Sequence, residues 1–430
     1  MTGIIRNVHS REVFDAKGLP TVEVEVLLDD GSLGKAAAPG GTSRGSNEAF
    51  DLRDGDKSYF GGTGVSKAVL KVNTEIAETL RGKNATDQEA IDRLLIDLDG
   101  TDSKSRLGGN AMVATSLANA KAAAKSRGIQ LFEHLGGGKE MPIPLVFVMF
   151  GGPVYVGLPG VCDFQEFGLY ALGVKTYKEG YIATLSIYKR LSEIVVKKRG
   201  FGTPRMAELA RTITASFDSN DEALATLTNL IEDEGYHPGK DFGIYLDIAS
   251  THLHKDGMYH LRRDNQVLSS GELIDKLVKM CHNYPIVSME DCLSEDDWDG
   301  WKNLTKRLGS RVQLVGDDLF VTNPKRLKKG IELGVANALV IKPNQIGTLT
   351  ETIETVKTAK AAGYGTIISS RSGELWDPYL VHLCVGQNLG QGKMVECPSG
   401  GPNLNELIRI EDYLGDEAVH KGRSILSPRI

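Results

Sequence analysis

Chemically reactive side chains stand at the ends of apolar runs in the second half of the chain. Each run is short and rich in branched apolar residues, and each stops at a carboxylate, a lysine or an arginine. In chain order these residues are Asp247, Glu290, Asp317, Lys342, Arg371 and Lys393. Carboxylates can hold a cation or move a proton, and cationic side chains can hold an anion. The intervals between the runs leave room for one strand and one helix each.

This alternation of short apolar runs with helical patterns predicts buried parallel strands joined by right-handed crossovers. We therefore predict an α/β fold with a (β/α)8-type barrel in the second part of the chain. In such barrels the functional groups lie at the C-terminal ends of the strands. The three acids and Lys342 would then face one cavity.

Three carboxylates on neighbouring strands would form a site made only of oxygen ligands. Such a site suits Mg²⁺, which takes carboxylates and keeps water molecules that substrate oxygens can replace. The alternative is that Asp247, Glu290 and Asp317 cap the helices that follow their strands, as acids often do in βα loops. Because three consecutive strands end in an acid and the fourth in Lys342, we favour the Mg²⁺ site.

The two ends of the run of cations have different predicted roles. Lys342 follows the apolar run Ala-Leu-Val-Ile, and burial together with a nearby cation would lower its pKa. This makes Lys342 a candidate general base, and the alternative is a lysine that only pairs with one of the acids. Arg371, with hydroxyl groups beside it, and Lys393 are candidates for binding a phosphate or another anion.

Two histidines, His252 and His254, follow Asp247 closely. One interpretation is a metal-binding pair, since neutral imidazole is a common metal ligand. We favour a solvated loop, because the sequence Lys-Asp-Gly that follows is typical of a turn.

The composition is that of a globular protein with more than one core. The chain has 430 residues, which favours two domains. Its formal net charge of −6 and the lack of a basic run argue against nucleic-acid binding. The five cysteines have no metal or disulfide spacing. Without a signal-peptide pattern or an apolar run of membrane length, we expect a cytoplasmic protein with no membrane partner.

The first part of the chain has a different pattern. Residues 3–37 alternate as strands do, and residues 65–127 have helical spacing. The glycine-rich segment 39–45 lies between them, and we favour a surface loop over the alternative of a lid with glycine hinges. Glycines and prolines after residue 135 break the pattern, so we predict an α+β domain at 1–138 and the barrel domain at 139–430. Within the latter we expect strands at 145–150 and 164–167, and helices at 175–200 and 220–234.

Motifs along nearly the whole chain resemble those of the enolase (phosphopyruvate hydratase) family. The segment Ser10 to Val24 is similar to the opening strand pair of that family. The similar motifs of the barrel half are Ser-Met-Glu-Asp at 288–291, Gly-Asp-Asp-Leu at 316–319, Lys-Pro-Asn-Gln-Ile-Gly at 342–347 and Ser-Ser-Arg-Ser-Gly-Glu at 369–374. The resemblance implies a barrel of the enolase kind preceded by an α+β capping domain.

The resemblance also implies a role for each reactive residue. The three acids Asp247, Glu290 and Asp317 would bind the catalytic Mg²⁺. Lys342 would remove the proton α to the substrate carboxylate. The residues implied to contact substrate are Gln165, Glu166, Arg371, Ser372 and Lys393.

Other parts of the site depart from the family pattern. Gly40 stands where enolases carry a serine that helps to bind a second Mg²⁺, and Val154 replaces a catalytic-site histidine. Glu208 is the candidate for the acid that protonates the leaving hydroxyl, but the glycines that shape its loop are replaced. The half of the site that removes the α-proton is therefore kept, and the half that expels hydroxide is changed.

Three functions are compatible with this pattern. The first is a divergent enolase that acts on 2-phosphoglycerate and phosphoenolpyruvate, or a repurposed paralogue. The second resembles carboxyphosphonoenolpyruvate synthase of phosphonate biosynthesis, which uses a phosphoglycerate and a nucleotide-activated phosphonoformate. The third is a non-catalytic interaction protein, against which the intact set of acids argues. The expected partners are a small phosphorylated or phosphonylated three-carbon acid and a second copy of the chain, since Arg11, Glu12 and Arg409 are similar to dimer-interface residues of the family.

Overall fold

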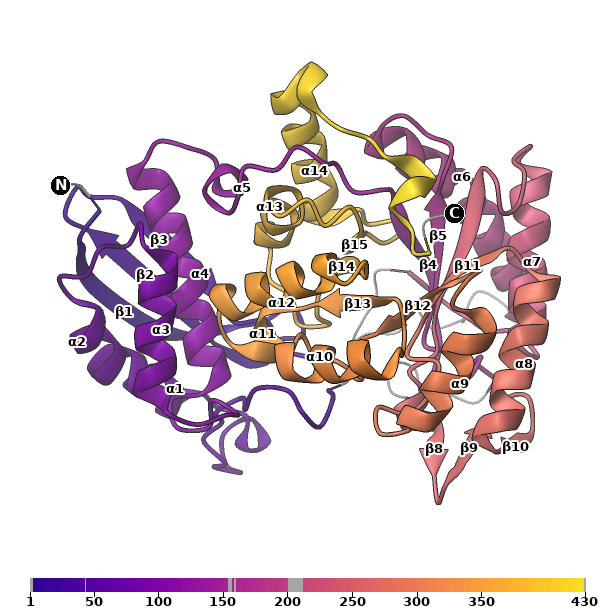
Figure 1. The fold of residues 1–430 in the computed structure, drawn as a ribbon, viewed down its shortest axis with the longest axis horizontal. Helices are drawn as coiled ribbons and strands as arrows, with labels where there is room; N and C mark the ends of the chain where they lie inside the picture. The colour runs from indigo at the N-terminus through magenta and orange to yellow at the C-terminus, as the bar shows by residue number, and fades with distance from the viewer. Residues whose placement is uncertain (1–2, 43, 154–156, 158–159, 200–211, 429–430) are drawn as a thin grey trace.

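A computed structural model describes residues 3–42, 44–153, 157, 160–199 and 212–428. Figure 1 shows an N-terminal part, in indigo and purple, beside a larger part that contains the long sheet and most of the helices. Among the described residues, no helix combines the length and the apolar character needed to cross a bilayer.

The N-terminal part contains a three-stranded antiparallel sheet covered by helices. Its strands are β1 (Ile5–Phe14), β2 (Pro20–Leu28) and β3 (Leu33–Ala37), in that order. Val22, Val24 and Val26 are fully buried on one face of β2, as expected from the period of two. The described helices are α1 (Ser66–Lys71), a π-helical turn (Val72–Ile76), α2 (Ala77–Leu80), α3 (Gln88–Asp99), α4 (Gly109–Ser126) and α5 (Leu131–His134).

Close packing of α4 on the sheet explains the small residues in its sequence. A Cβ added at Gly34 of β3 would overlap the backbone at Ala118 and Ala122 of α4. Glycine on the strand and alanine on the helix thus let the two backbones approach. The strands predicted within 3–37 and the helical character of 65–127 are confirmed.

The larger part is built on a nine-stranded sheet of described residues. The order is β15-β14-β13-β12-β11-β7-β5-β4-β6. The strands are β4 (Leu145–Phe150), β5 (Glu166–Ala171), β6 (Ile213–Thr214), β7 (Phe242–Asp247), β11 (Ile286–Glu290), β12 (Gln313–Gly316), β13 (Ala338–Ile341), β14 (Gly365–Ser369) and β15 (Gly392–Lys393). From β7 to β15 all neighbours are parallel, as predicted, whereas β5 is antiparallel to both β4 and β7.

Backbone pairing just beyond β15 closes the sheet into a barrel. Phe147 of β4 forms a parallel bridge with Glu396. Its N–H donates to the carbonyl of Val395 at 3.0 Å, and its carbonyl accepts from the N–H of Cys397 at 2.8 Å. Closure removes the free edges of the two strands, so the predicted barrel of the enolase kind is present.

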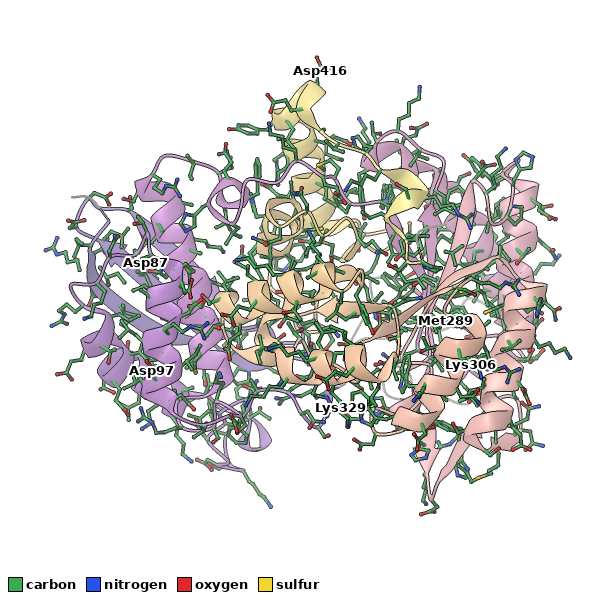
Figure 2. All side chains as sticks on the ribbon, viewed as in Figure 1. Asp87, Asp97, Met289, Lys306, Lys329 and Asp416 are labelled. Carbon is green, nitrogen blue, oxygen red and sulfur yellow. The ribbon has the colours of Figure 1, made fainter. Side chains whose placement is uncertain are left out.

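Helices cover the outside of the barrel, except for the short α11 (Pro343–Ile346), which lies at the end of the barrel that carries the acids. The covering helices are α6 (Tyr177–Arg199), α7 (Asn220–Asp233), α8 (Ser270–Asn283), α9 (Trp298–Leu308), α10 (Pro324–Leu333), α12 (Leu349–Ala361), α13 (Tyr379–Gly386) and α14 (Gly401–Leu414). In Figure 2, Met289 of β11 lies in the interior, while Lys306 and Lys329 lie on the exposed helices α9 and α10. The predicted helices at 175–200 and 220–234 correspond to α6 and α7.

A polar layer inside the barrel supports the ends of the strands. The hydroxyl of Tyr170 donates to Oε1 of Gln391 at 2.7 Å, and Nε2 of Gln313 donates to the same oxygen at 2.9 Å. Gln313 and Gln391 are fully buried, so these bonds satisfy groups that would otherwise be costly to bury. The barrel interior is therefore a packed core, and any ligand must bind at one of its ends.

Candidate active site

The sheet brings the predicted acids to one end of the barrel. Asp247 and Glu290 are the last residues of β7 and β11 and are paired in register. Glu166 opens β5 and is paired with Asp247 from the other side, because β5 runs in the opposite direction. Asp317 directly follows β12. All four acids are buried, so their side chains meet at the end of the barrel and away from bulk water.

These acids are not helix caps. The N-cap residues of α8, α9, α10 and α12 are Ser269, Asp297, Asn323 and Thr348. Each of these side chains accepts a hydrogen bond from a backbone N–H in the first turn of its helix. The helix-capping alternative for Asp247, Glu290 and Asp317 is therefore wrong.

Lys393 lies at the centre of three of the acids. Its Nζ is 2.6 Å from Oε2 of Glu166, 2.8 Å from Oδ2 of Asp247 and 2.7 Å from Oε1 of Glu290. Burial lowers the pKa of Lys393, but the three carboxylates outweigh burial and hold it well above its ordinary value. The lysine predicted to contact substrate thus neutralises the acids in this structure.

Burial and mutual repulsion still disfavour the charged forms of these acids, despite the ammonium of Lys393. Burial raises the pKa of Glu166 to about 7 and holds the pKa of Glu290 well above its ordinary value. Lys393 opposes the shift at both residues, and the charge of Asp247 adds to it. More negative charge is concentrated here than one ammonium group can stabilise, which favours additional binding of a cation.

Lys342 forms an ion pair with Asp317. The pair is held from both sides, since the N–H of Lys342 donates to Oγ1 of Thr322 at 2.8 Å and Nε2 of Gln345 donates to Oδ1 of Asp317 at 2.8 Å. Burial lowers the pKa of Lys342, but Asp317 outweighs burial and the pKa is raised. The expectation of a lowered pKa is therefore wrong for this arrangement, because the nearest partner of the ammonium is an anion.

Sequence reasoning missed Asp291. The carboxylates of Glu290, Asp291 and Asp317 offer oxygens that all lie within 4.8 Å of one another, a spacing that a metal ion could bridge. Asp291 has a positive φ of 44°, and its two oxygens accept the N–H groups of Asp317 and Asp318 at 2.9 and 3.0 Å. It thereby fixes the backbone that carries Asp317. The acid pairs at 290–291 and 317–318 were the available signal.

Two buried oxygens fit a hard divalent cation. Oδ1 of Asp247 and Oε1 of Gln165 are buried and have no hydrogen-bond partner among the described residues. Nε2 of Gln165 donates to the other oxygen of Asp247 at 3.2 Å, which fixes both side chains. A buried carboxylate oxygen without a partner is costly, and a cation such as Mg²⁺ would satisfy it. The donor set around Asp247 therefore fits the cation that the resemblance implies.

The N-terminal part contributes a lid segment, residues 39–47, to the site. Nη1 of Arg371 lies 3.0 Å from both Oε1 and Oε2 of Glu48, the residue that directly follows this segment. Within the lid segment, the N–H of Thr42 donates to Oγ of Ser372 at 2.9 Å, and the carbonyl of Gly40 accepts from the N–H of Gly373 at 2.7 Å. The segment thus packs against Arg371 and Ser372, two residues predicted to contact substrate, and it is a surface loop held against the barrel, whose role as a lid stays a prediction.

Further contacts fix the lid segment on the barrel. The hydroxyl of Ser46 donates to Oε1 of Glu295 at 2.8 Å. A Cβ added at Gly41 would overlap the guanidinium of Arg371, so only glycine allows this approach. Glu208, Val154 and Ser43 lie outside the described residues, and the predicted role of Glu208 as an acid remains a prediction.

Two protein-family models match the chain. The model described as "Enolase, N-terminal domain" matches residues 5–135, and the model described as "Enolase, C-terminal TIM barrel domain" matches residues 138–429. Together they span both parts of the structure and include every acid and lysine of the site. The chain belongs to the enolase family.

Proposed function

We propose that this protein is a Mg²⁺-dependent enzyme that removes the proton α to the carboxylate of a phosphoglycerate-like acid. The observation that carries the proposal is the meeting of Asp247, Glu290 and Asp317 with two buried lysines at one end of the barrel. When bound, Mg²⁺ would stabilise the negative charge that develops on the substrate carboxylate. Membership of the enolase family supports this reaction class.

The lysines have separate proposed tasks. Lys342 would accept the α-proton at Nζ in its neutral form, since it stands at the end of its own strand beside a metal-ligand candidate, Asp317. Against the effect of burial, Asp317 without a bound cation holds the lysine as an ammonium, and a cation bound by Asp317 would weaken this pair and lower the pKa of Lys342. Lys393 and Arg371 would hold the anionic ends of the substrate, because each carries a buried positive charge. Their present carboxylate partners, Glu166 and Glu48, lie where a substrate anion would compete for the same cations.

A second candidate function concerns the step after proton removal. A Cβ at Gly40 would lie 2.8 Å from Oδ2 of Asp15, so the serine found there in enolases would require the Asp15 side chain or the lid segment to shift. This observation favours a repurposed paralogue over a conventional dehydratase. The paralogue would join the phosphoglycerate to a nucleotide-activated phosphonoformate, as carboxyphosphonoenolpyruvate synthase does.

Hydrogen exchange tests the first step directly. Incubation of the protein with 2-phosphoglycerate and Mg²⁺ in heavy water should replace the α-proton with deuterium, as followed by proton NMR. Lys342→Ala should abolish the exchange. Lys104→Ala is the matched control, because Lys104 is also buried and paired with an acid, Glu351 at 2.9 Å, outside the cluster. No exchange by the wild-type protein at saturating Mg²⁺ would contradict the proposed function.

The same reaction mixture separates the two candidate functions. Formation of phosphoenolpyruvate, followed by its ultraviolet absorbance, would assign the dehydratase reaction. Exchange without phosphoenolpyruvate would assign the paralogue, whose second substrate is then required to complete turnover.

A further inference from the structure

A large cavity lies beside the cluster of acids and is not part of it. Its volume is about 830 Å³, and its described lining consists of residues 152, 153, 157, 160–163, 252–255, 260, 262 and 263, which belong to three segments of the chain. The first segment joins β4 to β5, and the other two belong to the small sheet of β8 (His254–Lys255), β9 (Met258–Leu261) and β10 (Gln266–Leu268) that follows β7. A volume of this size suits a ligand much larger than a three-carbon acid.

The cavity has a surplus of positive charge. Lys255 and Arg262 line it, are exposed, and have no acidic partner among the described residues. Arg263 also lines it, but its guanidinium is bound to Asp218 and to the carbonyl of Phe217. Two cations in the lining are thus unpaired, which is the arrangement that attracts an anion.

The acid in the described lining does not neutralise these cations. Asp163 accepts the N–H of Arg263 at 3.0 Å on both oxygens and the N–H of Asp264 at 3.3 Å. Asn220 donates to the same carboxylate at 3.4 Å. Asp163 is therefore committed to holding the turn after β9, and Lys255 and Arg262 remain available to a ligand.

Three histidines line the cavity, and His254 and His260 can add hydrogen-bond donors to it. His254 packs on Tyr259 with ring centroids 4.8 Å apart, which fixes its ring. His260 lies on β9, whose neighbours Tyr259 and Leu261 face the core. Nε2 of His252 is buried without a hydrogen-bond partner among the described residues. The favoured solvated loop at 252–254 is thus wrong for His252, which is partly buried.

The cavity and the acid cluster share a wall. A Cβ at Gly152 would lie 3.1 Å from the Cα of Gln165, and Gln165 in turn donates to Asp247. The carboxylates of Asp247 and Glu295 act electrostatically on His252 at the other side of the wall. A ligand in the cavity would therefore lie next to a substrate held by the acids.

We propose that this cavity is a second ligand site, which binds the phosphate or phosphonate group of an organic molecule through Lys255 and Arg262. The lysine would act as a point charge and the arginine as a planar fork on the phosphate oxygens. His254 and His260 would donate to the remaining polar atoms. Because the site lies outside the acid cluster, its ligand binding is independent of the proton exchange proposed above.

Calorimetric titration tests the site with defined probes. The four common nucleoside monophosphates and inorganic phosphate are titrated into the full-length protein. We expect at least one nucleoside monophosphate to bind with a Kd below about 1 mM. The double variant Lys255→Ala/Arg262→Ala should weaken this binding by about tenfold or more, since two charge-assisted hydrogen bonds are lost. Both residues are exposed, so the variant should fold normally.

Matched variants locate the probe. Arg6→Ala/Lys279→Ala removes one exposed arginine and one exposed lysine from β1 and α8 and should leave the affinity unchanged, and Lys342→Ala should also retain it. Tighter binding of a nucleoside monophosphate than of inorganic phosphate would assign an organic ligand. Binding of inorganic phosphate but of no nucleoside monophosphate would overturn the proposal that the ligand is organic. Absence of binding at about 10 mM, or equal binding by the wild type and the Lys255→Ala/Arg262→Ala variant, would overturn the site.

Discussion

Nη1 of Arg371 lies 3.0 Å from both carboxylate oxygens of Glu48, and both side chains are only 3% exposed. The pair joins the N-terminal part to the barrel, because Glu48 follows the lid segment and Arg371 follows β14. The carboxylate of Glu48 is thus bound to the arginine that is proposed to hold the substrate anion. The contact with Glu48 and the proposed binding of the anion therefore compete for the same guanidinium.

Replacing Glu48 with glutamine should make the thermal stability of the protein depend on added phosphate. Arg371 would remain buried without a full counter-charge, and the free energy of unfolding should fall by about 1–3 kcal/mol. Inorganic phosphate should restore the melting temperature, because an anion that binds only the folded state stabilises it. Glu23→Gln is the control, since its partner Arg11 is 40% exposed and such pairs contribute little. Equal phosphate dependence in both variants would contradict this prediction.

A methyl group at Gly41 should displace the lid segment. The added Cβ would overlap the guanidinium of Arg371, and the contacts at Ser372 and Glu295 would have to open to relieve it. Limited proteolysis of Gly41→Ala should therefore cut segment 39–47 faster than in the wild type. In Gly271→Ala, a Cβ on α8 meets no atom within 4 Å, so its digestion should match that of the wild type. Unchanged digestion of Gly41→Ala would show that the lid segment tolerates the methyl group.

The pKa of Glu166 predicts a pH-dependent stability without metal. Burial raises this pKa from its ordinary 4.5 to about 7 in the folded protein. The stabilising contribution of the protonated side chain is therefore complete below about pH 4.5 and is lost as the pH rises through about 7. Glu166→Gln stays neutral at every pH, so its stability relative to the wild type should rise between pH 5 and pH 8, by roughly 3 kcal/mol at most.

Urea unfolding in buffer that contains a metal chelator measures this difference. Glu89→Gln, at the first turn of α3, provides the control for loss of a carboxylate outside the barrel. A constant difference between Glu166→Gln and the wild type over this pH range would mean that Glu166 stays charged in the fold.

Much of the barrel was predictable because its strands carry their own signals. Runs such as Ala338–Ile341 are too short and too apolar for surface helices, and each one recurs after a helical pattern. The position of Lys342 at the end of such a run then follows from the geometry of parallel strands. The antiparallel direction of β5 was not predictable from such runs, because a buried strand has the same apolar pattern whether its neighbours are parallel or antiparallel.

The electrostatics of the site were less predictable than its members. Sequence spacing placed Lys342 and Asp317 at neighbouring strand ends, but it contained no information on which charge would lie closest to the ammonium. The same limit applies to Glu48, whose contact with Arg371 joins positions 323 residues apart. Long-range pairs of this kind depend on how the lid segment packs, and no local pattern encodes them.

The raised pKa of Lys342 should depend on Asp317. Burial and the charges of Arg371 and Lys393 lower this pKa, and Asp317 provides the largest opposing effect. Asp317→Asn should therefore move the pKa of Lys342 down, toward or below its ordinary value of 10.5. Carbon NMR of protein with labelled lysine side chains measures the shift, with Lys342→Arg used to assign the signal. A pKa that stays raised in Asp317→Asn would assign the effect to other acids.

Asp291 should determine metal affinity through the position of Asp317. In Asp291→Asn one oxygen can still accept an N–H, but the new amide group would point its own hydrogens at the second N–H, at Asp317 or Asp318. Asparagine tolerates a positive φ, so the backbone at 291 should keep its shape while the 317–318 turn shifts. Loss of a group that orients a metal ligand typically costs about 10–100-fold in affinity, and we expect Mn²⁺ binding to weaken by this factor.

Electron paramagnetic resonance of Mn²⁺ titrations measures the affinity of the Asp291 variant. Asp92→Asn is the matched control, because Asp92 is also fully buried and its Oδ2 accepts the N–H and the hydroxyl of Thr350 at 2.8 and 2.7 Å. This control should lose stability but bind Mn²⁺ as the wild type does. If Asp291→Asn folds normally and also binds Mn²⁺ like the wild type, the acids hold their positions without Asp291. The amides of Gln165 and Gln345, which donate to Asp247 and Asp317, would then be sufficient to hold these proposed metal ligands.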